Sequence, residues 1–566
     1  MDDQKPLLVD TGRGFSLQYK SRLLYSRYDP AKSAEQVCNT AAIFPETLYL
    51  LFSPCLCYGL ELLAQRLPPD SVIIAVEADE QLMRVAIESS TELRSRFPAL
   101  HLIRCDNSDS LIHYCRQTGQ FKRLIPLILS GGYELRRTVY EQMASALGTW
   151  LATQSRNRIA AVRMGRLWLR NSINNLTAMC WDQVLPNYQD SRPVLIVGAG
   201  PSLRSALPFI RRMQDSIHVM ACDTAIGALI VAGCRIDSVV CLEGQIHNLH
   251  DFLPLNRAPV LLFSDISAHP SGFREIKGNR VLLASSWTEN HFLERLAKLG
   301  LPLLNVPPLG SVGVLALHLA IQLFTGPIYL AGLDFSYIPG QTHCPGSPID
   351  YYESNRENRL YRRAWSWQQS YGTQVHKLLA GQLETPVLSM YAGMARELIS
   401  GLQQQDPERP VYDLRGTTGA ELGALRLQAP DFNLPAPLTS TSGTGQANGD
   451  ISVIKTTDEH SSQSCSQSNT ILSAQASEPG PDWQSVCITF LQNELDLIQT
   501  LRKTLRGEDC GRDLIELTAE LDYLYSHFPD AERVQLGQLD ALKRLSAEAA
   551  YWEGRLQAAL SAARSV

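Results

Sequence analysis

The stretch of sequence that decides the fold is Val194-Leu195-Ile196-Val197-Gly198-Ala199-Gly200-Pro201-Ser202-Leu203. Its four leading apolar residues predict a buried strand, and the glycine-containing turn behind them opens a helical pattern. A strand, a glycine turn and a helix in this order are typical of a βαβ unit, and they leave free N–H groups at the helix start. The stretch therefore predicts a cradle for a phosphate, with a purely structural strand-to-helix turn as the alternative.

This turn departs from the familiar nucleotide-binding motifs. Leu203 stands where a dinucleotide fingerprint has its third glycine, and no Gly-Lys-Ser/Thr of a P-loop follows. NAD binding and ordinary ATPase chemistry are therefore disfavoured. The residues predicted to bind a ligand here are Gly198, Ala199, Gly200, Pro201 and Ser202.

Downstream, the pattern of strands and helices continues and defines a central domain. Apolar runs predict strands at 194–197, 218–221, 238–242, 260–263, 280–284 and 328–330, with helices between them. Alternation of this kind is typical of a parallel sheet. We expect this central α/β domain to span residues 190–437.

Upstream, a second alternating region predicts a Rossmann-like N-terminal domain over residues 1–150, with strands at 48–52, 72–76, 101–104 and 124–129. Glu77 ends its second strand, as an acid does in nucleoside-binding domains of this type. Only Gly59 stands where a glycine-rich turn is expected, so the backbone cannot approach a phosphate closely. We therefore expect a structural or partner-docking role for this domain.

The remaining segments differ in composition. Helical periodicity predicts a connector over 151–189 and a small helical domain over 482–566. Residues 438–481 are rich in Ser, Thr, Gly, Gln and Asn, and such a stretch cannot bury enough apolar surface to offset its chain entropy. We expect a disordered linker there.

Charge and composition exclude several classes of function. With 51 Lys and Arg against 57 Asp and Glu, the formal charge of -6 gives no global basic field, so nucleic acid is not an expected partner.

No signal sequence and no apolar run of membrane-spanning length are recognised, so we expect a cytoplasmic protein without membrane insertion. Cys55 and Cys57 lack a second pair at metal spacing, and no metal site is predicted. The oligomeric state cannot be read from the sequence.

The glycine turn and the blocks that follow it resemble the motility accessory factor family of flagellin glycosyltransferases. That family shares its central domain with 6-hydroxymethylpterin diphosphokinase-like proteins, and its Gly-Pro-Ser-Leu turn is similar to that of bacterial sialyltransferases that use CMP-sugars. The blocks that carry the resemblance are residues 198–203, 221–225, 236–243, 309–313, 330–337 and 340–343. The resemblance implies an α/β protein with a Rossmann-like N-terminal domain, a central sialyltransferase-like domain with a parallel sheet, and a C-terminal helical domain.

Each of these blocks ends a strand or opens a helix, which is where an open parallel sheet presents its ligand crevice. Asp223 could accept a hydrogen bond from a ribose hydroxyl or could cap the following helix. Glu243 stands where the resembling families more often have Asp, so its role is less directly implied. Gly310 and Ser311 precede a buried helix whose N–H groups could bind an anion, and Ser311 could equally be its N-cap.

The catalytic group implied by glycosyl transfer is a base that removes the proton of the acceptor hydroxyl. His343 is our candidate because a histidine has a suitable unperturbed pKa, although a solvated loop histidine is the alternative. Asp334 could orient His343 or bind the nucleotide, and Tyr337 could donate a hydrogen bond to the departing phosphate. A thiol nucleophile at Cys344 is not needed for direct displacement.

The function implied by the resemblance is transfer of a nonulosonic, sialic-acid-like sugar from a CMP-sugar co-substrate to Ser or Thr hydroxyls of flagellin. No further cofactor is expected. The alternatives are an Mg²⁺- and ATP-dependent pterin diphosphokinase, for which Asp223, Asp237 and Glu243 are candidate ligands, and a nucleotide-binding scaffold without catalysis.

Overall fold

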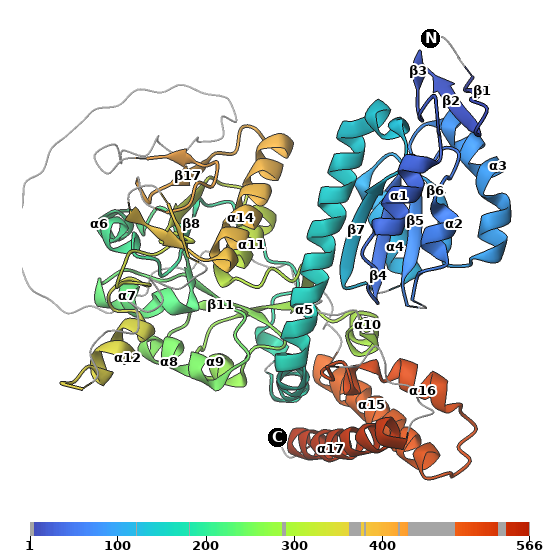
Figure 1. The fold of residues 1–566 in the computed structure, drawn as a ribbon. Helices are drawn as coiled ribbons and strands as arrows, with labels where there is room; N and C mark the ends of the chain where they lie inside the picture. The colour runs from blue at the N-terminus through green and yellow to red at the C-terminus, as the bar shows by residue number, and fades with distance from the viewer. Residues whose placement is uncertain are drawn as a thin grey trace, which may run out of the picture. The chain divides into compact units, whose positions relative to one another are not determined.

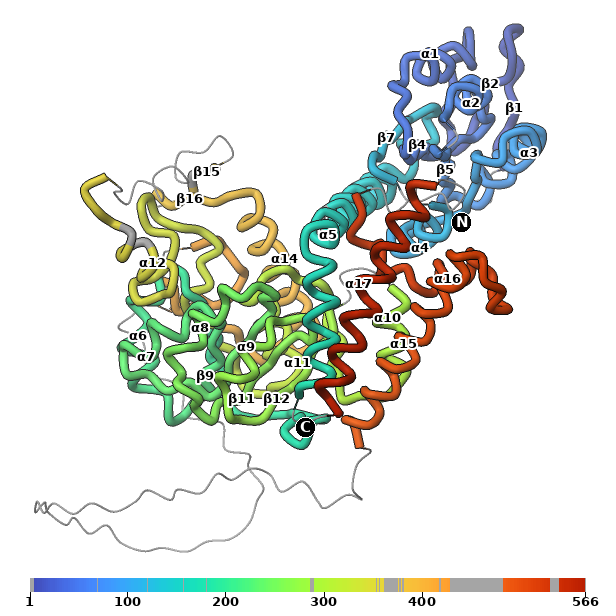
Figure 2. Tube along the Cα trace, turned by 90° about the horizontal axis from the view of Figure 1, so that it is seen from below, coloured from blue at the N-terminus to red at the C-terminus, as the bar shows by residue number. Residues whose placement is uncertain are grey.

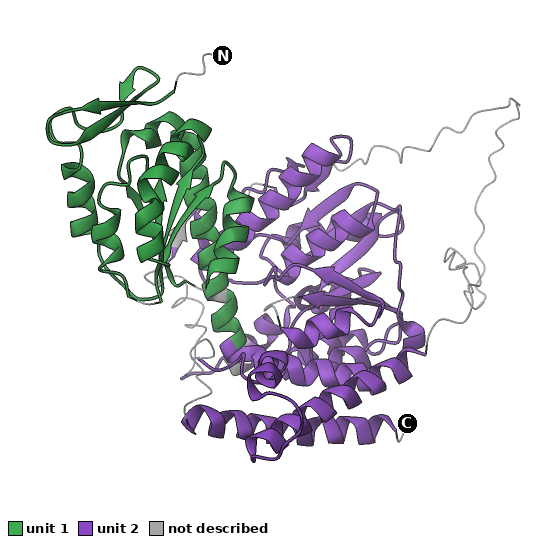
Figure 3. Ribbon diagram, turned by 90° about the vertical axis from the view of Figure 1, so that its right-hand side faces the viewer, with its two compact units in different colours: residues 1–161 green, residues 162–566 purple. Residues whose placement is uncertain are grey.

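The computed structural model describes residues 5–68, 70–119, 121–179, 181–285, 290–360, 375–378, 381–416, 419–427, 482–529 and 539–564 (Figure 1). The chain forms two compact units, residues 1–161 and 162–566, which are coloured separately in Figure 3. Long helix α5 (Arg137–Ala178) contains the boundary between them. The predicted linker 438–481 lies outside the described residues.

The first unit is built on a four-stranded parallel sheet in the order β6-β5-β4-β7. Its strands are β4 (Thr47–Phe52), β5 (Val72–Glu77), β6 (Leu100–Arg104) and β7 (Arg123–Ile128). Its helices before α5 are α1 (Lys32–Thr40), α2 (Leu60–Ala64), α3 (Glu80–Arg96) and α4 (Ser108–Thr118). Separate apolar clusters cover the two faces of the sheet, which explains why its strands are almost continuously hydrophobic. The predicted Rossmann-like arrangement is confirmed.

The carboxyl end of this sheet is filled by the chain's own residues. An antiparallel meander, β1 (Leu7–Asp10), β2 (Phe15–Tyr19) and β3 (Arg22–Leu23), leads into Tyr25, whose hydroxyl donates to the Pro54 carbonyl at 2.8 Å. Glu77 is fully buried and accepts from Ser53 Oγ at 2.7 Å and from the Tyr140 hydroxyl at 2.9 Å. Glu77 is therefore hydrogen-bonded within the unit, and the structural or partner-docking role of this domain stays a prediction.

The second unit is built on a nine-stranded sheet in which every pair of neighbouring strands is parallel, in the order β13-β12-β11-β10-β9-β8-β14-β17-β18. The strands are β8 (Val194–Val197), β9 (His218–Cys222), β10 (Ser238–Cys241), β11 (Leu261–Asp265), β12 (Arg280–Ser285), β13 (Leu303–Val306), β14 (Ile328–Ala331), β17 (Val411–Asp413) and β18 (Leu425–Arg426). The six strands predicted from the sequence are all present, whereas β13, β17 and β18 were not predicted. The chain runs outward from β8 to β13 and then returns to the other side of β8 with β14, so the strand order reverses between β8 and β14.

Helices cover both faces of this sheet (Figure 1). One face carries α6 (Leu203–Met213), α7 (Ile226–Val231), α8 (Leu249–Phe252), α9 (Pro270–Arg274) and α10 (His291–Ala297). The other carries α11 (Val312–Leu323) and α14 (Pro386–Gln405). Helix α11 is apolar apart from His318 and Gln322, which agrees with its burial between the sheet and α14. Helix α12 (Pro348–Arg356) and the short pair β15 (His376–Lys377) and β16 (Leu383–Glu384) lie in the connection from β14 to α14.

The C-terminal segment forms helices, as predicted: α15 (Trp483–Leu505), α16 (Leu514–Glu520) and α17 (Leu539–Ala563). Helices α15 and α17 run side by side and share the apolar cluster that covers one face of the central sheet (Figure 2). An ion pair between half-buried Arg295 and buried Glu494, Nε to Oε1 at 2.7 Å, joins α10 to α15. In the ranges the structure describes, no helix has the length and apolar character needed to cross a membrane.

Candidate functional site

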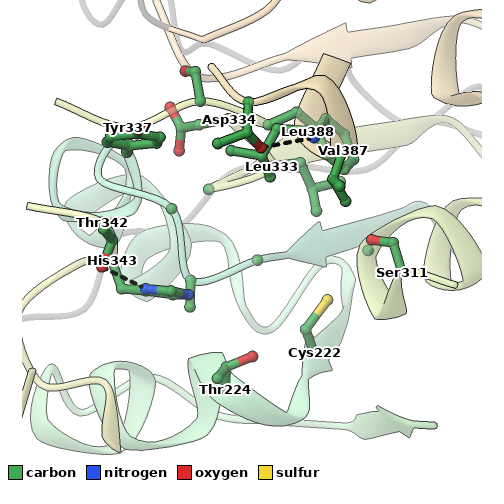
Figure 4. A pocket seen from close by; sticks show the side chains of 18 of the residues that line it. Cys222, Thr224, Ser311, Leu333, Asp334, Tyr337, Thr342, His343, Val387 and Leu388 are labelled. Atoms are coloured by element: carbon green, nitrogen blue, oxygen red, sulfur yellow. Dashed lines mark hydrogen bonds between the residues drawn. The ribbon is translucent and has the colours of Figure 1, made fainter. Parts of the chain in front are cut away.

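A cavity of about 820 Å³ opens at the carboxyl ends of β8, β9 and β14, where the strand order of the nine-stranded sheet reverses. This is the position at which open parallel sheets bind ligands. The segments that line it include 198–200, 311–313, 332–337, 342–343 and 385–388, together with Cys222 and Thr224. Figure 4 shows Thr342 and His343 on one side of the cavity and Ser311 on the other. The structure therefore brings together residues that lie almost two hundred positions apart.

The predicted glycine turn lines the cavity, but its N–H groups are mostly in use. The Gly198 N–H donates to the Ala331 carbonyl, and the Gly200 N–H donates to the Gly332 carbonyl, both at 2.8 Å. A Cβ at Gly198 would lie 2.5 Å from the Gly332 oxygen, and one at Gly200 would lie 2.7 Å from it. These glycines thus allow the turn after β14 to approach the turn after β8, which is a packing requirement in addition to any role toward a ligand.

Asp334 occupies the start of α6, where the sequence predicts a phosphate. Its Oδ2 accepts from Ser202 Oγ at 2.8 Å and from the Ser202 N–H at 3.2 Å, so the carboxylate provides the negative charge that a helix N-terminus favours. The side chain is 1 % exposed, and its Oδ1 has no hydrogen-bond partner among the described residues. Burial raises the pKa of Asp334, although the Ser202 hydroxyl and the charge of Arg415 act in the opposite direction. Asp334 is one of the residues that line the cavity, and its buried Oδ1 is an acceptor whose hydrogen bond is not made within the described residues.

The start of α11 remains available to an anion. Ser311 has the extended conformation of an N-cap, but its side chain makes no capping hydrogen bond. Ser311, Val312 and Gly313 all line the cavity, so the first N–H groups of a 12-residue helix are at its wall. These groups and the helix dipole favour a phosphate or carboxylate. Of the described lining residues none is Lys or Arg, so backbone dipoles have to supply much of the positive potential.

A second helix start at the cavity was missed by the sequence analysis. Thr385 precedes α14 and accepts from the Leu388 N–H at 3.3 Å, and residues 385–388 line the cavity. The sequence contains a pattern for this helix start, because Thr385-Pro386 before an apolar run is typical of an N-cap followed by proline at the first helical position.

His343 and Tyr337 lie at the cavity wall, as the predicted catalytic roles require. His343 is half-buried, and its Nδ1 lies 3.1 Å from Thr342 Oγ1, a hydroxyl that can donate to this nitrogen or accept from it. Burial lowers the pKa of His343, which favours the neutral imidazole that can accept a proton. The Asp334 carboxylate bonds to Ser202 rather than to His343, so Thr342 is the residue that orients the ring. Burial raises the pKa of Tyr337, which keeps its hydroxyl protonated as a donor.

The Cys344 thiol is unsuited to act as a nucleophile. It is 1 % exposed, and burial raises its pKa to about 12. Nucleophilic cysteines have a lowered pKa, because the thiolate is the reactive form.

The other predicted site residues do not line the cavity. Asp223 is buried and accepts from the adjacent Thr224 N–H at 2.8 Å, while Thr224 itself lines the cavity. Neither the 3-10 turn at 223–225 nor α7 has a side-chain cap, so the capping alternative is not observed. Burial raises the pKa of Asp223 to about 6. Glu243 is exposed and accepts from the Gln245 N–H at 2.8 Å. Pro201, Ser202 and Gly310 are not among the lining residues, although Ser202 donates a hydrogen bond to Asp334, which is. In the part of the chain that the structure describes, no group of three or more His, Cys, Asp or Glu is placed to hold a metal ion.

Comparison with known proteins agrees with this architecture. Residues 170–340 match the family model described as 6-hydroxymethylpterin diphosphokinase MptE-like. The structure of the Maf glycosyltransferase from Magnetospirillum magneticum AMB-1 superimposes on the whole chain and on 91 % of its own length, with a TM-score of 0.52 at 12 % identity. The resemblance seen in the sequence is therefore confirmed for the fold of the whole chain and for the central domain.

Two relatives from Treponema pallidum (strain Nichols), each described as an uncharacterized protein, are similar in sequence. One is 28 % identical over 558 residues, which cover 96 % of this chain and 93 % of the relative. The other is 35 % identical over 85 residues, which cover 15 % of this chain and 40 % of the relative. The first similarity extends over 96 % of this chain, so it includes residues of both units and of the C-terminal helices.

Proposed function

We propose that this chain, which has the fold of a Maf glycosyltransferase, transfers a nonulosonic sugar from a CMP donor to Ser or Thr hydroxyls of flagellin. The observation that carries the proposal is the cavity at the carboxyl ends of β8 and β14, which combines an uncapped helix start with a histidine whose pKa is lowered by burial. The sequence blocks that resemble motility accessory factors supply four of its lining segments. The donor and the acceptor follow from that resemblance.

In the proposed mechanism, the donor phosphate lies against the first N–H groups of α11. His343 removes the proton of the acceptor hydroxyl while the acceptor oxygen bonds to the anomeric carbon. The bond from that carbon to the phosphate oxygen breaks, and the phosphate leaves with the electron pair. The Val312 and Gly313 N–H groups and the Tyr337 hydroxyl stabilise the charge that develops on it.

Asp334 has a binding role in this mechanism. Its unpartnered Oδ1 accepts a hydrogen bond from a hydroxyl or amino group of the donor, which helps to fix the donor in the cavity. The N-terminal domain and the C-terminal helices would contribute to binding of the protein acceptor.

The test is transfer in a defined mixture. Purified chain, a CMP-nonulosonate and unmodified flagellin are incubated, and the flagellin is weighed by intact mass spectrometry. The proposal expects mass increases of one sugar residue that require the donor. Unchanged flagellin mass, with donor and acceptor of verified quality, would refute it. Thermal stabilisation by CMP without any product would support the scaffold alternative instead.

A pterin diphosphokinase is the second candidate, and the match of residues 170–340 to the MptE-like model favours it. This reaction moves pyrophosphate from ATP to the hydroxyl of a hydroxymethylpterin and needs Mg²⁺ held by carboxylates. Formation of the pterin diphosphate from ATP, measured by mass spectrometry with Mg²⁺ present, would identify it.

A further inference from the structure

We infer that Arg415 is a positioning residue for the proposed transfer: it holds the turn after β14 so that Asp334 and Tyr337 face the cavity. The expected effect on kcat rests on the proposed function. The expected effect on the backbone of the turn does not, and it is measured separately by hydrogen exchange. Arg415 does not line the cavity and lies beyond the blocks that carry the family resemblance.

Arg415 follows β17 and forms a fully buried ion pair with Asp413. Its Nε donates to Asp413 Oδ1 at 2.8 Å and its Nη2 to Asp413 Oδ2 at 2.7 Å, while the two side chains are 0 % and 1 % exposed. The planar guanidinium matches the two carboxylate oxygens, which leaves the outer N–H groups of the fork for other acceptors.

Those outer N–H groups connect the turn after β14 to the loop after β17. Nη1 donates to the Leu333 carbonyl at 2.8 Å, and Nη2 also donates to the Ala420 carbonyl at 2.9 Å. The Ala420 N–H in turn donates to the Asp334 carbonyl at 2.9 Å. Nη1 also donates to the Asp334 carbonyl at 3.4 Å, so Arg415 is bonded to Leu333 and Asp334 directly and to Asp334 a second time through Ala420.

The turn needs such support because its backbone is strained. Phe335 has a φ of 47°, a left-handed conformation that is unusual for a bulky aromatic residue. Strain of this kind persists only where contacts with the surrounding structure hold the backbone in place. Phe335 lies between Asp334 and Tyr337, so relaxation of its backbone would move both side chains relative to the cavity.

Lysine cannot replace Arg415 in this role. It keeps the charge beside Asp413, but its ammonium is a point donor that cannot reach the carboxylate and both carbonyls with the same geometry. Arg415→Lys therefore removes support from the turn while retaining the buried charge.

The chain offers a matched control at the other end of the same strand. Arg409 precedes β17, is 8 % exposed, and donates to three carbonyls, those of Ala320, Ile321 and Gly326, at 2.9–3.0 Å. It lies at the amino ends of β14 and β17 and does not line the cavity. Arg409→Lys thus makes the same change in another buried guanidinium group, away from the turn.

The experiment measures hydrogen exchange and kinetics for both variants after their folding is checked by circular dichroism. We expect Arg415→Lys to speed amide exchange in a peptide covering residues 332–341, whereas Arg409→Lys leaves that peptide unchanged. We expect Arg415→Lys to lower kcat by about 10- to 100-fold because the transition-state groups are misplaced. KM for the CMP-sugar should rise as well, because Asp334 helps to hold the donor, but it should rise less than kcat falls, because the α11 amides are untouched.

The outcomes separate the inference from the proposed function. Equal exchange and equal kcat in the two variants would overturn the inference even if wild-type protein transfers sugar. Faster exchange in residues 332–341 of Arg415→Lys, in a protein that transfers no sugar, would support the positioning of the turn and refute the function.

Gln382→Ala serves as a second variant should Arg415→Lys not fold. Gln382 Oε1 accepts from Ser336 Oγ at 3.1 Å and from the Gly419 N–H at 2.6 Å, so it joins the same turn to the same loop. Its removal should also speed exchange in residues 332–341 and lower kcat. Wild-type values of both in this variant would overturn the inference.

Discussion

At the scale of single residues, Asp334 is the most informative side chain. A carboxylate from the turn after β14 caps the helix that follows the glycine-rich turn, and it does so through Ser202. This contact directs our assignment of the donor phosphate to the start of α11, because the α6 start already has its negative charge. It also makes the geometry of Asp334 sensitive to anything that moves the two turns apart.

Gly200→Ala tests this closeness. The new Cβ would lie 2.0 Å from Asp334 Oδ2 and 2.7 Å from the Gly332 oxygen, so backbone has to move. We expect a loss of about 1–3 kcal/mol in the free energy of unfolding, measured with urea. Gly401→Ala, in α14 with nothing within 4 Å of the added atom, should instead stabilise by about 0.5–1 kcal/mol. A tolerated alanine at position 200 would show that the turns are not in contact.

His343→Ala tests the proposed base. We expect kcat to fall by about 10²- to 10⁴-fold, while affinity for CMP, measured by calorimetry, stays within a few-fold of wild type. His247→Ala, which changes an exposed histidine of the same unit, should have wild-type kcat. Activity of His343→Ala near the wild-type rate would mean that another group is the base.

The pH profile of the wild-type protein gives an independent check on His343. Burial favours the neutral form, and the neutral form is the active base, so activity should rise with pH and level off. The midpoint of this acid limb in kcat/KM should lie below 6.5, the ordinary value for histidine, and His343→Ala should lack it. A midpoint above 6.5 would contradict the assignment, because it would require a charged environment that stabilises the imidazolium.

At the scale of elements, most strands of the two sheets could be predicted from apolar runs. Strands β13, β17 and β18 could not. Strand β17 has only three residues and follows Pro410, and β13 follows Pro302, so neither gives a long apolar signal. The glycine turn was predicted from local pattern, whereas its partner, Asp334, lies 132 residues away from Ser202. Arg415 could not be found for the same reason, since its role depends on which strands become neighbours in the sheet.

Ser311→Asp tests the start of α11 as the anion site. An aspartate at this N-cap position would accept from the first N–H groups of the helix, which should leave the protein equally or more stable. Its charge would repel a phosphate at the same place, so affinity for CMP should fall by at least about tenfold. Asn107→Asp makes a similar change at the N-cap of α4 and should leave CMP binding unaltered. Wild-type affinity in Ser311→Asp would place the phosphate elsewhere.

At the scale of the whole molecule, the two units differ in what their sheets present. In the first unit, Tyr25 and the buried Glu77 fill the carboxyl end of the sheet, while the second unit has a cavity at the corresponding place. We expect one CMP site per chain for this reason. The sequence indicated the difference, because the first unit has only Gly59 in place of a glycine-rich turn.

Chelation tests which chemistry the whole chain performs. If helix dipoles hold the phosphate, transfer of sugar should retain most of its rate in EDTA. Complete loss of activity in EDTA, restored by added Mg²⁺, would favour the diphosphokinase instead.

The central claim is that the cavity at the carboxyl ends of β8 and β14 binds the phosphate of a cytidine nucleotide. A crystal structure of the full chain grown with CMP tests it most directly. The account predicts phosphate oxygens within hydrogen-bond distance of the Val312 and Gly313 N–H groups, and a donor group of the nucleotide at Asp334 Oδ1. Density for CMP at any other place, or a cavity that stays empty at saturating CMP, would contradict it.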